Sequence, residues 1–179
     1  MIDHALNKQQ TPRIYVACLA AYNNGKLHGT WIDCDQDAED IWAEIEQMLK
    51  TSPEPDAEEW AIHDYEGWQG ISIDESTHPE KIAELAELLE KYGTAFAKYY
   101  EYHSDYASAE DFQEHYVGEY ESEEDFVYAQ WEESGQLKQL EDSGIPESYI
   151  NWKAIARDWF IDSYYSIEAG YQEVHVFRC

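Results

Sequence analysis

Basic residues are scarce in this chain of 179 residues, which has 11 Lys+Arg against 39 Asp+Glu. Proteins that bind nucleic acid neutralise phosphates with clusters of Lys and Arg, so this composition argues against direct binding of nucleic acid. The same scarcity argues against attachment to an anionic membrane surface. The partners expected for such a chain are therefore basic surfaces.

Cysteines are also few, and long apolar runs are missing. Cys18, Cys34 and Cys179 are an odd number of thiols without the spacing of a disulfide framework or a metal site. No apolar run approaches the ~20 residues that span a bilayer, and no apolar leader stands at the N-terminus. We therefore expect a reduced, cytoplasmic protein that does not associate with membranes.

Motifs of common catalytic centres are absent. The sequence lacks G-x-S-x-G, a P-loop, H-E-x-x-H and C-x-x-C. Carboxylates are so numerous that no glycosidase-like pair stands out. His63 and Asp64 are adjacent and could form an acid–base pair, but we interpret His63 as structural because no nucleophile accompanies it. We predict that the chain is not an enzyme and needs no cofactor.

One segment partly matches a calcium-binding loop. Asp33, Asp35, Asp37 and Glu44 fill its first, third, fifth and twelfth positions. Ala38, however, stands where the loop needs glycine for its turn. We interpret the segment as the acidic start of a helix, which the helix dipole favours, and predict no metal site.

The abundant carboxylates give a formal net charge of −28, far more than solubility requires. Self-repulsion of this size opposes compaction. Yet 44% of the residues are hydrophobic and 15% are aromatic, which suits a packed core and not a disordered acidic tail. The acidic residues recur from Asp33 to Glu173 among core-type residues. We therefore expect the charge to coat a folded body.

Hydrophobic periodicity predicts an α+β fold. The elements expected in the first half are strands over 13–22 and 27–32 joined by a turn at 23–26, a helix carrying the apolar positions 41–49, strands over 60–65 and 70–73, and helices over 79–92, 94–103 and 108–117. Those expected in the second half are a short strand near 116–120, helices over 122–133 and 151–161, and a hairpin of 164–168 and 173–178 that turns at Ala169-Gly170. We expect an N-terminal α+β domain over 12–76, a central helical domain over 77–116 and a C-terminal α+β domain over 117–179.

A few acidic elements side by side would carry a surface charge density of the same order as that of DNA. On the predicted helix 79–92, Glu80, Glu84 and Glu87 recur about once per turn, ~5.4 Å apart. Duplex DNA carries one phosphate per ~3.4 Å of axis per strand, and a charge of −28 equals the phosphates of about 14 base pairs. We predict a surface that imitates the charge of DNA. Its expected residues are Asp35, Asp37, Glu39, Glu58, Glu59, Glu80, Glu84, Glu87, Glu110, Asp111, Glu114, Glu121, Glu123 and Glu124.

Three segments resemble the ArdA-type antirestriction proteins. They are YNNGKLHGTW at 22–31, AIHDYE at 61–66, and SYINW at 148–152 followed by ARD at 156–158. The likeness runs from about Ile14 to Phe177. It implies an elongated chain of three small domains that mimics bent B-form DNA. The chain departs from the family in its extension over 1–12 and in a longer, more aromatic central segment.

The resemblance also implies partners. It implies inhibition of type I restriction–modification enzymes through contacts with their DNA-recognition and methyltransferase subunits. It further implies a homodimer formed through the C-terminal third, at residues such as Tyr120, Phe126, Tyr128, Trp131 and Tyr149. Two alternatives stay open at this stage: an acidic interaction module for another basic protein, and an enzyme whose acidity is an adaptation to salt.

Overall fold

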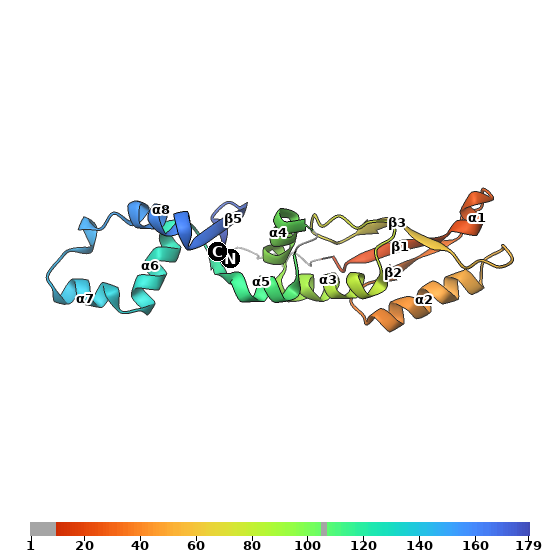
Figure 1. Cartoon of the computed structure of the whole chain (residues 1–179), viewed down its shortest axis with the longest axis horizontal. Helices are drawn as coiled ribbons and strands as arrows, with labels where there is room; N and C mark the ends of the chain where they lie inside the picture. Colours follow the sequence, from red (N-terminus) through yellow and green to blue (C-terminus); the bar gives the residue numbers. More distant parts are fainter. Residues whose placement is uncertain (1–9, 105–106) are drawn as a thin grey trace, which may run out of the picture. The chain divides into compact units, whose positions relative to one another are not determined.

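The protein is described by a computed structural model that covers residues 10–104 and 107–179. It divides into two compact units, the first ending at Ala97 and the second beginning at Lys98. Figure 1 labels most of the elements along the chain. The described residues form eight α-helices and two three-stranded antiparallel sheets, which confirms the predicted α+β class.

The sheet of the first unit contains β1 (Arg13–Cys18), β2 (Gly29–Asp33) and β3 (Trp60–Glu66), in the order β2-β1-β3. The predicted hairpin is confirmed, because β1 and β2 pair antiparallel. The prediction of a strand as far as Tyr22 was wrong, since the short helix α1 (Leu19–Asn23) follows β1 directly. Ala21 is fully buried there, and its carbonyl accepts hydrogen bonds from the N–H groups of Asn24 and Lys26.

Two amphipathic helices complete the first unit and pack against each other. Helix α2 (Ala38–Lys50) buries Ile41, Ile45 and Met48. Helix α3 (Pro79–Tyr92) has the predicted bounds: proline suits its first turn, and Gly93 ends it at a positive φ of 53°. Both helices place apolar residues at three- and four-residue spacings on the inner face, so the acidic positions between them face solvent.

The prediction of a strand over 70–73 was wrong. Ile71 and Ile73 are buried, but their segment has no strand pairing. A turn closes where the N–H of Ile71 donates to the carbonyl of Trp68, and the buried indole of Trp68 donates to the carbonyl of Arg13 at 3.0 Å. The alternation of apolar residues therefore reflects burial of an irregular segment, which sequence periodicity does not distinguish from a strand.

The second unit has the sheet order β4-β6-β5. Its elements, with the helix that leads into it, are α4 (Thr94–His103), α5 (Ala109–His115), β4 (Tyr116–Tyr120), α6 (Glu123–Glu133), α7 (Gln136–Asp142), the 3-10 helix η2 (Glu147–Tyr149), α8 (Trp152–Asp162), β5 (Tyr164–Gly170) and β6 (Glu173–Arg178). Helices α6 and α8 pack on a core that includes Phe126, Val174 and Val176. Residues Phe112 and Phe177 belong to a second aromatic cluster, with ring centroids 5.9 Å apart.

Short sequence patterns predicted some of the caps, helices and turns of the second unit correctly and missed others. The predicted caps are present, since the hydroxyls of Ser108 and Ser122 accept hydrogen bonds from the N–H groups three residues later. Helix α7 was not predicted, because it buries no residue and so lacks an apolar stripe. The terminal hairpin is confirmed, but its turn lies at 171–172, where Gln172 has a φ of 54°, and not at Ala169-Gly170.

Candidate functional site

The acidic residues all lie at the surface of the described chain. No described Asp or Glu is buried, and His175 is the one buried charged or polar residue in the described ranges. The first unit (1–97) holds 20 acidic and 6 basic residues and the second (98–179) holds 19 and 5, so each has a formal net charge of −14. Each unit alone therefore has an anionic coat over an apolar core.

The fourteen carboxylates predicted to imitate DNA are accessible to a partner. Eleven are exposed and three are half-buried. The half-buried ones are Glu84, Glu123 and Glu124. This placement follows from helix periodicity, because the apolar positions take the inner face and leave the acidic positions outside.

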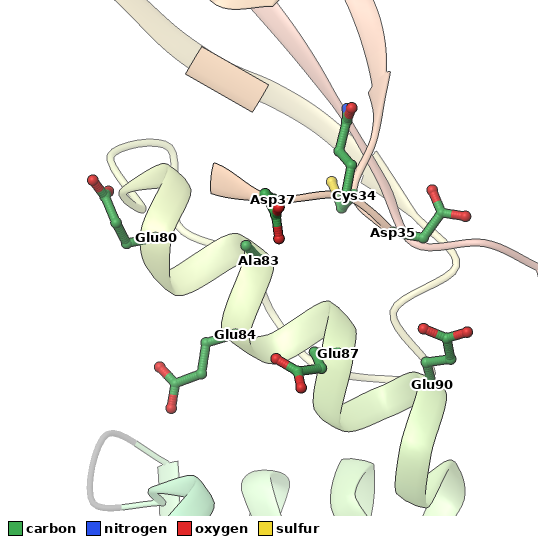
Figure 2. A pocket seen from close by; sticks show the side chains of 9 residues that line it. Cys34, Asp35, Asp37, Glu80, Ala83, Glu84, Glu87 and Glu90 are labelled. Atoms are coloured by element: carbon green, nitrogen blue, oxygen red, sulfur yellow. The ribbon is translucent and has the colours of Figure 1, made fainter. Parts of the chain in front are cut away.

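In the first unit, six carboxylates line a hollow of about 370 Å³ between α3 and the segment that joins β2 to α2. We call it the acidic hollow, and its carboxylates are those of Asp35, Asp37, Glu80, Glu84, Glu87 and Glu90. Figure 2 shows the four glutamates along successive turns of α3, with Asp35 and Asp37 on the segment across from the helix. Glu90 was not among the predicted residues, although its spacing continues the row of Glu84 and Glu87.

The row of glutamates on α3 keeps to one side of the helix. Spacings of four, three and three residues hold Glu80, Glu84, Glu87 and Glu90 within a sector of roughly 120°. The row covers about 15 Å of helix axis, so the six carboxylates of the hollow amount to roughly one per 2.5 Å. Duplex DNA carries one charge per ~1.7 Å of axis. The charge density of the hollow is therefore of the same order as that of a duplex.

Cations offset only part of this charge. Glu84 pairs with Lys81 at 3.0 Å, and Glu80 pairs with His78. The pKa of Glu80 is lowered mainly by a hydrogen bond from the backbone N–H of Glu80 itself, and to a smaller extent by the contact with His78. Within residues 10–104 and 107–179, the other four carboxylates of the hollow have no cationic side chain within ion-pair distance. These four are free to meet the cations of a partner.

The calcium-like segment lies beside the hollow, and its middle holds a hydrogen-bond donor. The side-chain amide of Gln36 donates to the carbonyl of Asp33 and to Oε1 of Glu44, each at 2.7 Å. Helix α2 begins at Ala38, directly after Asp37. The amide of Gln36 thus binds a carboxylate oxygen of Glu44 that a calcium loop would turn toward the ion, which supports the interpretation as an acidic helix start.

In the first unit, Cys34 is buried and His63 packs against an aromatic ring. Burial, and then the charges of Asp33, Asp35 and Glu44, raise the pKa of Cys34 to about 12, so its thiol stays protonated at neutral pH. His63 packs edge-on against Tyr22, with ring centroids 4.8 Å apart. The carboxylate of Asp64 instead accepts the N–H of Tyr65. The adjacent histidine and aspartate therefore have separate partners.

In the second unit, predicted carboxylates gather at helix N-termini and strand ends. Glu110 and Asp111 stand in the first turn of α5, and Glu123 and Glu124 in the first turn of α6, where the helix dipole stabilises negative charge. Glu123 accepts a hydrogen bond from Ser166 at 2.7 Å. The carboxylates of Glu121, Glu123, Glu124 and Glu168 line a hollow of about 500 Å³. Glu168 was not among the predicted residues.

The residues predicted to form a dimer interface differ in accessibility. Phe126 is fully buried in the core of the second unit, so its side chain serves the fold of its own chain. Tyr120, Tyr128 and Trp131 are half-buried, whereas Tyr149 is 79% exposed. Sequence patterns indicate that aromatic residues will be sequestered, but they do not distinguish a core from an interface.

Comparison with known families gives a match that covers most of the chain. Residues 14–173 match the family described as Antirestriction protein (ArdA). A search of curated proteins gives no match. In the described part of the chain, no helix combines the length and the apolar character needed to cross a membrane.

Proposed function

Because the chain belongs to the ArdA antirestriction family, we propose that it inhibits restriction–modification enzymes by offering carboxylates in place of DNA phosphates. The observation that carries this proposal is the surface placement of every described Asp and Glu, with a net charge of −14 on each unit. A charge of −14 equals the phosphates of about seven base pairs. The ArdA family consists of inhibitors and not of known enzymes, so we assign the chain no catalytic step.

The physical basis of the proposal is ion exchange on a rigid scaffold. A groove that binds DNA is lined with Lys and Arg, which attract the negative field of this chain and accelerate encounter. Fixed carboxylates have less conformational entropy to lose on binding than a flexible acidic tail. Binding through many exposed charges weakens steeply as salt rises. We therefore expect tight, salt-sensitive binding to such a groove.

The target that we propose is a type I restriction–modification enzyme, bound at its DNA-recognition and methyltransferase subunits. The contact surface comprises the predicted carboxylates together with Glu90 and Glu168, which line the same two hollows. The acidic hollow supplies four carboxylates that lack a cation within the described residues.

We also propose the elongated arrangement of three domains, over 12–76, 77–116 and 117–179, and a homodimer. Ile145, at 48% exposure, lines one hollow with Tyr128, and Tyr149, four residues further along the chain, is 79% exposed. Small-angle scattering should give an extended particle of twice the chain mass. Replacing Tyr149 with serine should shift sedimentation toward the monomer, and an unchanged dimer would place the interface elsewhere.

Competition for a type I enzyme tests the main proposal. The enzyme is mixed with a fluorescent duplex that contains its recognition site, and the chain is added at low salt. The chain should displace the duplex, and the displacement should weaken as salt rises. Poly-glutamate of matched total charge is the control, and we expect it to compete much less. Failure of the chain to displace DNA at low salt would exclude the mechanism, and equal competition by poly-glutamate would exclude a role for the folded scaffold.

A further inference from the structure

Three metal-ligating side chains meet on the sheet of the second unit. Glu119 on β4 stands directly opposite His175 on β6 in the antiparallel register. Glu173 lies two residues before His175, so its side chain leaves the same face of β6. One ligand atom from each of the three residues lies within 4.8 Å of those from the other two. Pairing of the two strands therefore assembles the cluster.

His175 is unusual because its side chain is 2% exposed and one of its nitrogens has no partner. Nε2 makes no hydrogen bond within the described residues, although Oε1 of Glu173 lies 3.5 Å away. A buried polar atom left without a hydrogen bond is costly, so such atoms are rare in folded proteins. The unpaired nitrogen lies beside a carboxylate oxygen of Glu173, and the cluster also includes a carboxylate oxygen of Glu119, which points to a cation among the three side chains.

We propose that Glu119, Glu173 and His175 bind a divalent transition-metal ion, with Zn²⁺ the preferred one. An imidazole nitrogen with two carboxylate oxygens suits zinc, whereas calcium and magnesium prefer oxygen ligands alone. The three ligands leave a fourth position for water. The proposal concerns the sheet of the second unit and does not depend on inhibition of a restriction enzyme.

The distances allow the ion to enter with small side-chain movements. Zinc bonds of ~2.0–2.1 Å in a tetrahedron place neighbouring ligand atoms roughly 3.3 Å apart. The 3.5 Å between Nε2 of His175 and Oε1 of Glu173 is close to this value. Glu119 is exposed, so its carboxylate can rotate to close the remaining gap. The buried histidine sets the position of the site, and the two glutamates adjust to it.

Tyr116 supplies the contact that orients the histidine. Its hydroxyl lies 3.3 Å from Nδ1 of His175. The neutral hydroxyl can accept a hydrogen bond from Nδ1–H, which leaves the lone pair of Nε2 for the metal. Metal-binding histidines commonly carry such a partner on the second nitrogen.

Calorimetry with Zn²⁺ on the full chain tests the site. Millimolar Mg²⁺ is present throughout to occupy the diffuse acidic surface. We expect one Zn²⁺ per chain with a Kd in the micromolar range or below. Glu119→Gln and Glu173→Gln should each weaken binding at least tenfold. Glu133→Gln and Asp162→Asn, which remove exposed carboxylates elsewhere in the unit, should change it less than twofold.

Two further measurements distinguish Zn²⁺ bound at these three ligands from Zn²⁺ bound non-specifically by the acidic surface. Co²⁺ in place of Zn²⁺ should give visible absorption bands of low-coordinate cobalt, and both glutamine variants should lose them. Zn²⁺ should raise the thermal unfolding midpoint of the wild type more than that of either variant. Absence of a stoichiometric site would overturn the proposal. Binding that both glutamine variants retain would overturn it as well.

Discussion

Neutralising four carboxylates of the acidic hollow is the sharpest test of how the surface binds. The variant Asp35→Asn/Asp37→Asn/Glu87→Gln/Glu90→Gln removes the members of the hollow that contact no cation in the described residues. Each substitution keeps the size of the side chain and occurs at an exposed position. The fold should persist, so the change in binding reports on charge.

The expected size of the effect follows from exposure. An exposed ion pair contributes ~0.2–1 kcal/mol, which corresponds to a change of roughly 1.4- to fivefold in affinity. Any one substitution should therefore weaken binding to the enzyme by less than about fivefold. Four independent ion pairs combine to a loss between about fourfold and several hundredfold. The slope of log affinity against log salt should fall by up to ~0.9 for each ion pair that the substitutions remove.

The assay is displacement of a fluorescent duplex from a type I enzyme at several salt concentrations. The matched control is Asp56→Asn/Asp64→Asn/Glu75→Gln/Asp162→Asn, which removes the same total charge from exposed positions outside the predicted surface. The control should mainly slow association, because it lowers the overall field and leaves the ion pairs of the bound surface in place.

Three results would contradict this reasoning. An unchanged affinity and salt slope in the hollow variant would show that the hollow does not meet the enzyme. An equal loss in the control variant would show that only total charge matters. Loss of binding on changing Glu87 alone would indicate a localised hot spot, which exposed charges on a spread surface should not produce.

Four further predictions concern the fold and its thiols. Phe126→Ala should lower the free energy of unfolding by ~3–5 kcal/mol in urea titrations, since the ring is fully buried, and a loss below ~1 kcal/mol would contradict its place in the core. Ser122→Ala should cost ~1 kcal/mol by removing the N-cap of α6, and Ser134→Ala at the other end of that helix should cost less than ~0.5 kcal/mol. At pH 8 a thiol reagent should modify Cys179 rapidly and Cys34 only after unfolding, since burial raises the pKa of Cys34 from 9.0 to about 12. The stability that the buried thiol contributes is fully present below pH 9 and is lost as the pH rises toward 12. Over that range Cys34→Ala should therefore lose less stability than the wild type, and an equal loss in both proteins would refute the assignment.

The sequence alone determined the features that depend on neighbouring residues. Helix α3 has the predicted bounds, because proline, a three- to four-residue apolar repeat and a terminal glycine act within one or two turns. The caps at Ser108 and Ser122 likewise follow from spacings of three residues. The total charge follows from composition, and the resemblance of three short segments to the ArdA family led to the prediction of an antirestriction protein, in agreement with the family match.

Only the tertiary structure decided which distant residues meet. It brought Asp35 and Asp37 across from Glu90, and it paired Glu119 with His175, 56 residues further along the chain. It also placed Phe126 in the core of the second unit, whereas the sequence did not distinguish a core position from an interface position for this ring. Local spacing fixes the face of a helix or strand that a side chain occupies, whereas the path of the chain fixes what that face meets.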